Sequence, residues 1–398
     1  MRILHVSDCF PPRTGGIETQ VHDLAGLQVE AGHEVHVATA TAGADGARRA
    51  TRVLRTGVRV HRMASALTLG LPANPRGPWL LRQAIARLRP DVVHVHAGVV
   101  SPFALDGMVA ARLTGVPLAV TWHCMLDGFV TAYGALSRLT GMGRTAAAVS
   151  AVSRVAGERV AAMLDRDDVL VLPNGLTVAD WRPPADRSAA VPDGPLRLVA
   201  TQRLAPRKRV SPLVDVVAAA HRRLGTDASG APRLHLTVIG SGPEGARVRA
   251  QVHRLGLDGV VSLVGQLQRD ELRARYADEH VFVAPARLEA FGIAGLEARA
   301  AGLPVVAGRG TGVSEYITDG RDGLLTPDRG DGLDDAAADA ALTDAIVRLA
   351  EERELLDRLR YQAFTTPPPA DWADVLTACE RLYARALARS GRTPSDET

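Results

Sequence analysis

Short apolar runs that alternate with amphipathic segments constrain the fold of this chain more than any other feature. In the first half the runs lie at residues 2–7, 34–39, 58–63, 92–96, 118–121, 147–152 and 169–172, and in the second half at 196–201, 234–239, 260–264, 281–284, 304–307 and 323–326. Helical patterns such as 17–31, 78–88 and 102–113 separate them. Parallel strands are buried on both faces and need helical crossovers. The alternation therefore predicts an α/β protein with doubly wound parallel sheets.

The length of 398 residues is enough for two such domains. Pro173-Asn174-Gly175 closes the first half, and residues 177–196, rich in Pro, Asp and Ala, read as a linker. One charged helix is expected at 342–359, a proline break at 365–369 and a terminal helix at 371–388, with a frayed end at 390–398. We expect a first domain at 1–175, a second at 176–365, and a final helix with its tail at 366–398.

Charge and cysteine content narrow the class of protein. The formal net charge is +3 and the excess arginines are scattered, which suits phosphate ligands, and no nucleic-acid-binding signature is present. Cys9, Cys124 and Cys379 form no disulfide framework and no metal-binding spacing, which favours a reducing cytoplasm. The first residues pass directly into a strand, and no apolar run approaches the roughly 20 residues that span a bilayer, so neither a signal peptide nor a membrane span is expected.

The helix expected at 78–88 has two interpretations. Trp79 with Arg82, Arg87 and Arg89 makes it basic and amphipathic, as in helices that contact an anionic membrane from its cytoplasmic side. Such a helix is also an ordinary surface helix, with one face packed and the other in water. Peripheral membrane contact therefore stays open.

Residues 284–302 carry the densest set of candidate functional groups. After a buried strand, Glu289 lies in a loop and Glu297 on an Ala-rich helix that Gly302 ends. Eight helical steps would separate the two carboxylates by roughly 12 Å, which suits the two ends of an elongated ligand. The backbone N–H groups of residues 291–293 stand at the helix N-terminus, where a diphosphate is favoured.

Other loops at strand ends supply cations and flexible backbone. Arg203 and Lys208 follow the first strand of the second half, where two cations can clamp a diphosphate. Gly15 and Gly16 follow the first strand of the chain, and their N–H groups can approach a phosphate. His123 ends another strand and can bond a substrate hydroxyl, or it is an imidazole at the edge of the core.

Together these motifs resemble the family 4 retaining glycosyltransferases. E-A-F-G-I-x-x-x-E followed by A-x-x-A-G-L-P-V-V-A matches their E-x7-E signature, and R-L-x-P-x-K, I-G-x-G-P, P-N-G and GHEVHV occur in the family's order. The resemblance covers most of the chain. It implies a GT-B fold, in which two Rossmann-like domains face a central cleft and the last helix crosses back to the first domain.

By resemblance, Arg203 and Lys208 bind the donor diphosphate, Glu289 the sugar hydroxyls and Glu297 the ribose. His123 would contact the transferred sugar. The implied catalytic set is His123, Arg203, Lys208 and Glu289, and the implied substrate-binding set is Gly15, Gly16, Phe291, Gly292, Ile293 and Glu297.

The implied reaction moves a hexose from a nucleoside diphosphate sugar to an acceptor hydroxyl with retention, without a metal or cofactor. The donor phosphate helps to remove the acceptor proton. The acceptor is a glycan, a lipid or a small molecule. The opening loop and His94-Val95-His96 resemble enzymes that glycosylate phosphatidylinositol, but these positions are too few to fix a lipid.

Some residues support other interpretations. The G-x-G-x-x-G at 240–245 suggests an NAD-dependent oxidoreductase, although the next strand ends without the acid that holds a ribose. A catalytically inactive nucleotide-sugar-binding protein would keep the same cations. Asp165-Arg166-Asp167 is a D-x-D, which we interpret as a solvated loop because it precedes a strand.

Further positions are weighed against the family pattern. Thr177 stands where the family often has Asp. Gly312 and Glu315 match the family's G-x-x-E, and Glu315 is expected to be structural. His94 and His96 are acceptor-side candidates or core residues.

Overall fold

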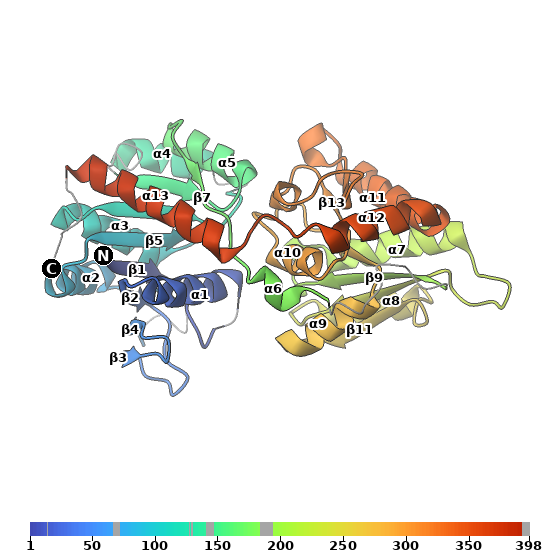
Figure 1. Ribbon diagram of the computed structural model, residues 1–398, viewed down its shortest axis with the longest axis horizontal. Coiled ribbons are helices and arrows are strands. Elements are labelled where there is room, and N and C mark those ends of the chain that lie inside the picture. Colours follow the sequence, from blue (N-terminus) through green and yellow to red (C-terminus); the bar gives the residue numbers. More distant parts are fainter. Residues whose placement is uncertain are drawn as a thin grey trace. The chain divides into compact units, whose positions relative to one another are not determined.

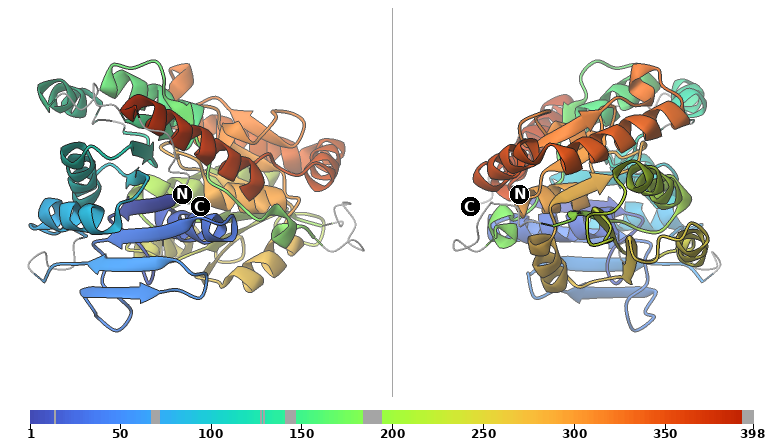
Figure 2. Two further views of the ribbon diagram at one scale, coloured as in Figure 1. Left: turned by 60° about the vertical axis from the view of Figure 1, so that its left-hand side comes forward. Right: turned by 90° about the vertical axis from the view of Figure 1, so that its right-hand side faces the viewer.

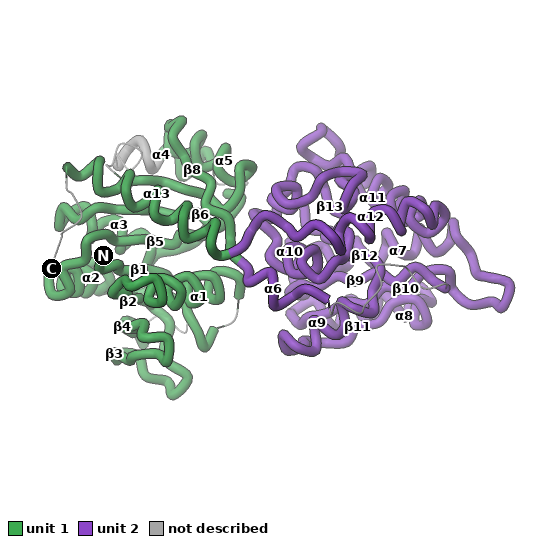
Figure 3. Tube along the Cα trace, in the orientation of Figure 1, with its two compact units in different colours: residues 1–175, 372–398 green, residues 176–371 purple. Residues whose placement is uncertain are grey.

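The computed structural model describes residues 1–13, 15–66, 72–126, 128, 130–140, 147–183 and 194–391, with the backbone alone at 136–140. The chain divides into two compact units, residues 1–175 with 372–398 and residues 176–371 (Figure 3). Part of the expected linker, 184–193, and the end of the tail, 392–398, lie outside the described residues.

Unit 1 is built on an eight-stranded sheet of order β3-β4-β2-β1-β5-β6-β7-β8. Its strands are β1 (Arg2–Ser7), β2 (Glu34–Thr39), β3 (Arg49–Val53), β4 (Arg59–Met63), β5 (Val92–Ala97), β6 (Leu118–Trp122), β7 (Ala148–Ala151) and β8 (Leu170–Val171). Its helices are α1 (Gly16–Glu30), α2 (Gly77–Leu88), α3 (Pro102–Thr114), α4 (Val130–Thr140), α5 (Arg154–Leu164) and α13 (Trp372–Ser390), as Figures 1 and 2 show. All pairings are parallel except that of β3 with β4.

The two faces of this sheet are covered by different helices. Side chains alternate between the faces of a strand, so Ile3, Val92 and Ala119 share one face. They pack with Trp372, Leu382 and other residues of α13 in one buried cluster. On the opposite face α3 approaches so closely that a Cβ at its Gly107 would lie 2.8 Å from Val6. The C-terminal helix is therefore part of the core of unit 1.

Unit 2 has a six-stranded parallel sheet of order β11-β10-β9-β12-β13-β14. Its strands are β9 (Leu196–Thr201), β10 (Leu234–Ile239), β11 (Val261–Gly265), β12 (Val281–Ala284), β13 (Val305–Gly308) and β14 (Gly323–Thr326). Its helices are α6 (Val178–Trp181), α7 (Val210–Leu224), α8 (Gly245–Arg254), α9 (Arg269–Asp278), α10 (Ile293–Ala300), α11 (Asp335–Glu351) and α12 (Arg353–Thr365), with 3₁₀ turns η2 (Pro206–Lys208), η3 (Gly312–Glu315) and η4 (Arg329–Asp331).

The doubly wound parallel α/β class is confirmed, and the apolar runs are strands within one or two residues of their expected ends. The single helix expected at 342–359 is wrong. Glu352, with φ −95° and ψ 77°, separates α11 from α12, because a residue with that ψ leaves the helical region.

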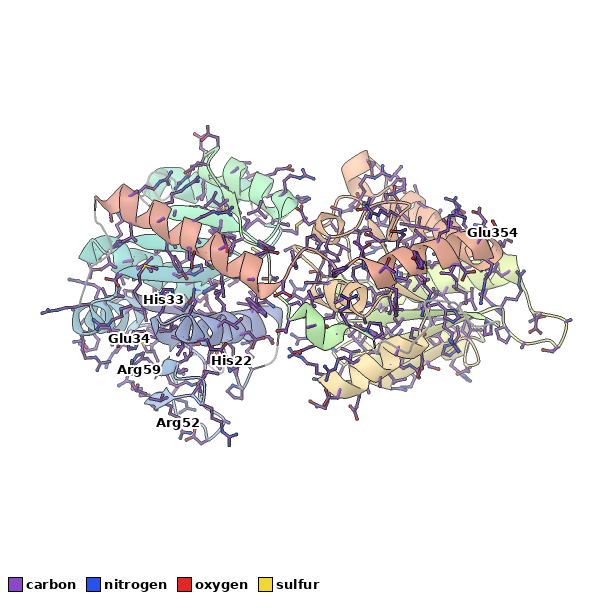
Figure 4. The ribbon with its side chains drawn as sticks, in the orientation of Figure 1. His22, His33, Glu34, Arg52, Arg59 and Glu354 are labelled. Carbon is purple, nitrogen blue, oxygen red and sulfur yellow. The ribbon has the colours of Figure 1, made fainter. Side chains whose placement is uncertain are left out.

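Strand β3 is absent from the sequence-based expectation. Nearly all of its side chains are exposed, so it lacks the apolar pattern on which the other strands were found. Beside it, Arg59 on β4 forms an ion pair with Glu34 on β2, 3.0 Å apart, and charged groups of this kind are typical near a sheet edge (Figure 4).

Candidate functional site

The predicted site residues fall into two groups. Gly15, Gly16 and His123 belong to unit 1, whereas all the others belong to unit 2.

In unit 2 the turn between β12 and α10 is held by neighbouring backbone. Gly292 precedes the helix with φ +83°, and a Cβ there would lie 2.7 Å from Val313, so glycine is required. The Gly312 N–H donates to the Glu289 carbonyl (2.8 Å), and the Tyr316 hydroxyl donates to the Gly292 carbonyl (2.7 Å). These contacts fix the loop that carries Glu289.

Glu289 forms an ion pair with Lys208, whose Nζ donates to its Oε2. Lys208 ends the η2 turn after β9, and the two side chains are 25% and 19% exposed. The structure thus brings together two residues that are 81 positions apart in the sequence. A cation and a carboxylate that face each other at the open edge of a parallel sheet can meet both an anionic and a hydroxylic group of one ligand.

Arg203 is exposed and forms no side-chain hydrogen bond or ion pair with any described residue. Arg207 is also exposed, whereas Arg209 is bound to Asp335 and Asp339 at 3.2 and 2.8 Å. Arg203 and Arg207 are therefore available to a ligand, whereas Arg209 is already neutralised by its acidic partners.

The G-x-G loop after β10 supports the Arg203 loop. The Leu204 N–H donates to the Ser241 carbonyl and the Glu244 N–H to the Leu204 carbonyl, at 2.9 and 3.0 Å. A side chain at Gly242 would collide with the Leu204 carbonyl. The glycine is needed here for the approach of one backbone to another.

Glu297 lies on the first turns of α10, largely shielded from water. Burial raises the pKa of its carboxyl to about 7, and only the nearby Arg269 guanidinium opposes the shift. Because α10 begins at Ile293, only part of the segment between Glu289 and Glu297 is helical. The spacing of eight helical steps that we considered from the sequence does not apply.

The N-terminal turn of α10 presents backbone donors. The first intrahelical hydrogen bond that follows the cap runs from the Leu296 N–H to the Gly292 carbonyl, at 3.1 Å. The preceding N–H groups of the helix have no partner within it. Phe291 itself is buried against Tyr316, with ring centroids 5.5 Å apart, so its side chain belongs to the core.

In unit 1, Gly15 and Gly16 begin α1 beside an acidic side chain. The Glu18 carboxylate covers Gly15 so closely that a side chain on Gly15 would overlap it, and Arg13 lies 3.5 Å from Glu18. Thr14, in the same loop, is outside the described residues.

Asn174 and Gly175 are held against α1 and α13. The Gln20 side-chain amide binds both backbone groups of Gly175, at 2.8 and 2.9 Å, and the Trp372 indole occupies the space where a Cβ of residue 175 would lie. Asn174, Gln20, Trp372 and His123 line a cavity of about 20 Å³, which is room for roughly one water molecule.

His123 follows β6, and its Nε2 lies 3.1 Å from Nδ1 of His96. Burial lowers the pKa of the His123 imidazole to about 4, and a contact with the Asn174 side chain partly offsets this. The imidazole is therefore neutral at pH 7. Its Nδ1 is shielded from water and has no hydrogen-bond partner in the described part of the chain.

Sequence reasoning missed several polar residues around His123. His5, Gln28, Thr121, Ser150 and Tyr383 are buried with His94 and His96 in one layer. A signal was present, because the polar residues in β1, β5, β6 and β7 stand two positions after apolar ones and so share one face.

The remaining sequence candidates have local explanations. Asp165 caps the end of α5 and is exposed, as is Asp167, in agreement with a solvated loop.

Trp79 on α2 is 55% exposed, and Arg82, Arg87 and Arg89 are exposed with it. None of the described helices has the length and apolar character that a bilayer span requires.

Solved structures share this architecture. A sucrose-phosphate synthase from Thermosynechococcus elongatus superimposes with a TM-score of 0.72 and 21% identity over 97% of this chain and 99% of that one. Anabaena HepE in complex with UDP and glucose superimposes with a TM-score of 0.69 and 18% identity over 96% of this chain and 100% of the HepE chain. At these identities the likeness establishes the fold, which is GT-B as the motifs predicted.

The sequence comparisons are more specific. Residues 14–180 match the family described as Glycosyltransferase Family 4, and 182–366 match Glycosyl transferases group 1. A GDP-mannose-dependent alpha-(1-6)-phosphatidylinositol monomannoside mannosyltransferase of Mycolicibacterium smegmatis is 30% identical over 86% of this chain and 89% of its own length. A GDP-mannose-dependent alpha-mannosyltransferase of Mycobacterium tuberculosis is 30% identical over 98% of this chain and 98% of its own length. The glycogen synthase of Mycobacterium tuberculosis is 28% identical over 99% of this chain and 97% of its own length. The chain belongs to the family 4 glycosyltransferases of GT-B fold.

Proposed function

We propose that this protein is a retaining hexosyltransferase that transfers mannose from GDP-mannose to an acceptor hydroxyl without a metal ion. The choice of donor rests on the mycobacterial relatives, whose names describe them as GDP-mannose-dependent mannosyltransferases. The mechanism rests on the position of Lys208 and Glu289 at the open end of β9 and β12, which is the observation that carries the proposal.

In this proposal Arg203 and Lys208 bind the donor diphosphate together with the N–H groups at the start of α10. The leaving diphosphate gains negative charge as the glycosidic bond breaks, so fixed cations and helix N–H groups stabilise the transition state more than the ground state. Protein-borne charge then does what a metal does in other transferases.

Glu289 has a double role in the proposal. In the structure it neutralises Lys208. When the donor binds, the diphosphate takes over Lys208, and the Glu289 carboxylate becomes free to accept hydrogen bonds from the sugar hydroxyls. Glu297, deeper on α10, accepts hydrogen bonds from the ribose, and His123 of unit 1 contacts the transferred sugar.

The direct test is transfer from GDP-mannose, with the anomeric configuration of the product read by NMR. We expect an α-linked product from the α-configured donor and unchanged turnover in EDTA. Glu289→Gln should lower kcat by a hundredfold or more, because a charge-assisted contact at the reacting sugar is worth about 3 kcal/mol.

The nucleotide affinity of the same variant is the internal control. Glu289→Gln removes the partner of Lys208, so GDP should bind as well as to the wild type or a few times more tightly. A β-linked product, a loss of activity in EDTA, or wild-type turnover by Glu289→Gln would contradict the proposal.

The diphosphate clamp predicts different effects for neighbouring cations. Arg203→Ala and Lys208→Ala should each weaken GDP binding by about ten- to a hundredfold, since hydrogen bonds to charged groups contribute about 1.5–3 kcal/mol. Arg207→Ala is the matched control, because this side chain is exposed on the same loop but stands at a variable position of the motif. Equal losses in all three variants, measured by calorimetry, would mean that only the general charge of the loop matters.

Glu297 should make the stability of the empty protein depend on pH. Its pKa is about 7 in the folded protein and near 4.5 in the unfolded chain, so between these values the folded state binds more protons. The free energy of unfolding should therefore fall by about 2–3 kcal/mol as the pH rises from 4.5 through 7.

Glu297→Gln should lose this decrease, because the amide does not titrate. Urea unfolding at several pH values measures it, with Glu351→Gln, an exposed position on α11, as the control for simple charge removal. Identical pH profiles for the wild type and Glu297→Gln would show that Glu297 ionises normally.

A lipid-borne acceptor is the form of the proposal that the α2 surface favours. Exposed Trp79 beside three exposed arginines suits the interface of an anionic membrane. Vesicles that contain phosphatidylinositol should bind the protein at low salt and release it at high salt. Trp79→Ala with Arg82→Ala should abolish binding, whereas an equally active protein that never binds vesicles would indicate a soluble acceptor, such as a glycan.

A further inference from the structure

A layer of buried polar side chains lies on one face of the unit 1 sheet. Its members stand toward the C-terminal ends of neighbouring parallel strands, beneath α1 and α13. The register aligns His5 with His94, His96 with Thr121, and Thr121 with Ser150. We call the following residues the histidine network: Ser150, Thr121, His94, Tyr383, Gln28, His5, His96 and His123.

Every imidazole of the network is neutral at pH 7. Burial lowers the pKa of His5 and His123 to about 4, and it holds the pKa values of His94 and His96 well below the ordinary range. A neutral imidazole carries one N–H, so one ring nitrogen donates and the other accepts. The direction of each hydrogen bond therefore determines the direction of the next.

One end of the network has a fixed direction, because a backbone carbonyl can only accept. The Ser150 hydroxyl donates to the Val120 carbonyl at 3.4 Å, and its oxygen then accepts from the Thr121 hydroxyl at 2.8 Å. The Thr121 oxygen accepts from Nε2–H of His94 at 2.7 Å. Nδ1 of His94 consequently accepts from the Tyr383 hydroxyl, 2.9 Å away.

Gln28 transmits this direction from the C-terminal helix to the other histidines. Its side-chain NH₂ donates to the Tyr383 oxygen at 2.9 Å, so its carbonyl oxygen faces His5 and accepts from Nε2–H at 2.7 Å. Nδ1 of His5 then accepts from Nε2–H of His96 at 2.9 Å.

The last link reaches the site. Nδ1 of His96 accepts from Nε2–H of His123 at 3.1 Å. Among these described residues, only Nδ1 of His123 lacks a hydrogen bond to the protein. The Asn174 side chain contacts the same imidazole and raises its pKa, but no hydrogen bond joins it to Nδ1.

We propose that the histidine network is a positioning device that holds His123 as its Nε2–H tautomer, so that Nδ1 accepts a hydrogen bond from a hydroxyl group of the bound sugar. Gln28 and Tyr383 are positioning residues, since they act on the sugar only through His123. This proposal rests on the proposed contact between His123 and the transferred sugar. It adds that Tyr383, on the C-terminal helix α13, helps to decide what His123 can bind.

A metal centre is the competing interpretation of the same residues. Among the described residues, His5, His94 and His96 each offer a nitrogen, and these atoms lie within 4.8 Å of one another. However, both ring nitrogens of all three already have protein partners. A bound ion would have to break several of these hydrogen bonds, so the contacts favour the network.

The first experiment measures the tautomer directly. Long-range ¹H–¹⁵N spectra of the ¹⁵N-labelled full-length protein at pH 7.5 distinguish the protonated ring nitrogen from the bare one, and His123→Gln assigns the signal. We expect one tautomer of His123, with the proton on Nε2. A proton on Nδ1, an equal mixture, or stoichiometric zinc in the purified protein would overturn the proposal.

The second experiment breaks the network at a distance. Gln28→Met keeps the size of the side chain but removes both its donor and its acceptor, and Tyr383→Phe removes the hydroxyl. Each should give a mixture of His123 tautomers and lower kcat by roughly tenfold, with GDP affinity unchanged because unit 2 is untouched. Leu387→Met is the matched control, since this α13 side chain is buried and has no hydrogen-bonding group.

These readouts separate the network from the function on which it rests. If the His123 tautomer is as expected and shifts in Gln28→Met, but His123→Gln transfers sugar at the wild-type rate, the network stands and the sugar contact is wrong. If Gln28→Met and Tyr383→Phe lower only the melting temperature and leave the tautomer unchanged, these residues are structural and the proposal fails. Tyr383→Phe keeps the test decisive if Gln28→Met does not fold.

Discussion

The reversal of strand order in each parallel sheet determines where chemistry can take place in this protein. In unit 2 the sheet grows from β9 toward β10 and β11 on one side and toward β12, β13 and β14 on the other. The loops after β9 and β12 therefore diverge from neighbouring strands and leave a space between them, which is where open α/β sheets bind ligands. Lys208 and Glu289 occupy these two loops. The same reversal occurs in unit 1 between β1 and β5, and the loop after β1 carries Gly15 and Gly16.

Close contacts between backbones restrict the conformations open to these loops. The backbone of the G-x-G loop packs directly against the backbone of the Arg203 loop, with no side chain between them. A backbone hydrogen bond joins η3 to the loop that carries Glu289. Loops restricted in this way allow cations and carboxylates to be positioned before a ligand arrives, which limits the reorganisation that binding and reaction require. In this protein the glycines of the family motifs serve loop packing as much as contact with a ligand.

Burial acts in opposite directions on the acids and bases of the two units. It raises the pKa of Glu297 and lowers the pKa values of the network histidines, because water stabilises charged groups better than protein does. At pH 7 the network histidines are therefore neutral and the Glu297 carboxyl is only partly ionised, so both kinds of group can form directional hydrogen bonds. The charged pair of Lys208 and Glu289 stands instead where both side chains are partly exposed. The charged pair thus lies at the edge of the sheet, whereas burial determines the protonation state of Glu297 and of the network histidines.

The sequence by itself determined the strands, the α/β class and the loops in which Arg203, Lys208, Glu289 and His123 stand. These depend on apolar periodicity and on motifs within a few residues of one another, and both are local properties of a chain. It did not reveal β3, whose side chains face water, or the break at Glu352, where one apolar pattern continues across two helices. Only the tertiary structure decided which loops meet: Lys208 and Glu289 are 81 residues apart, and Gln28 and Tyr383 are 355 apart. Such pairs follow from the order of strands in a sheet and from the return of α13 to unit 1, which no local pattern encodes.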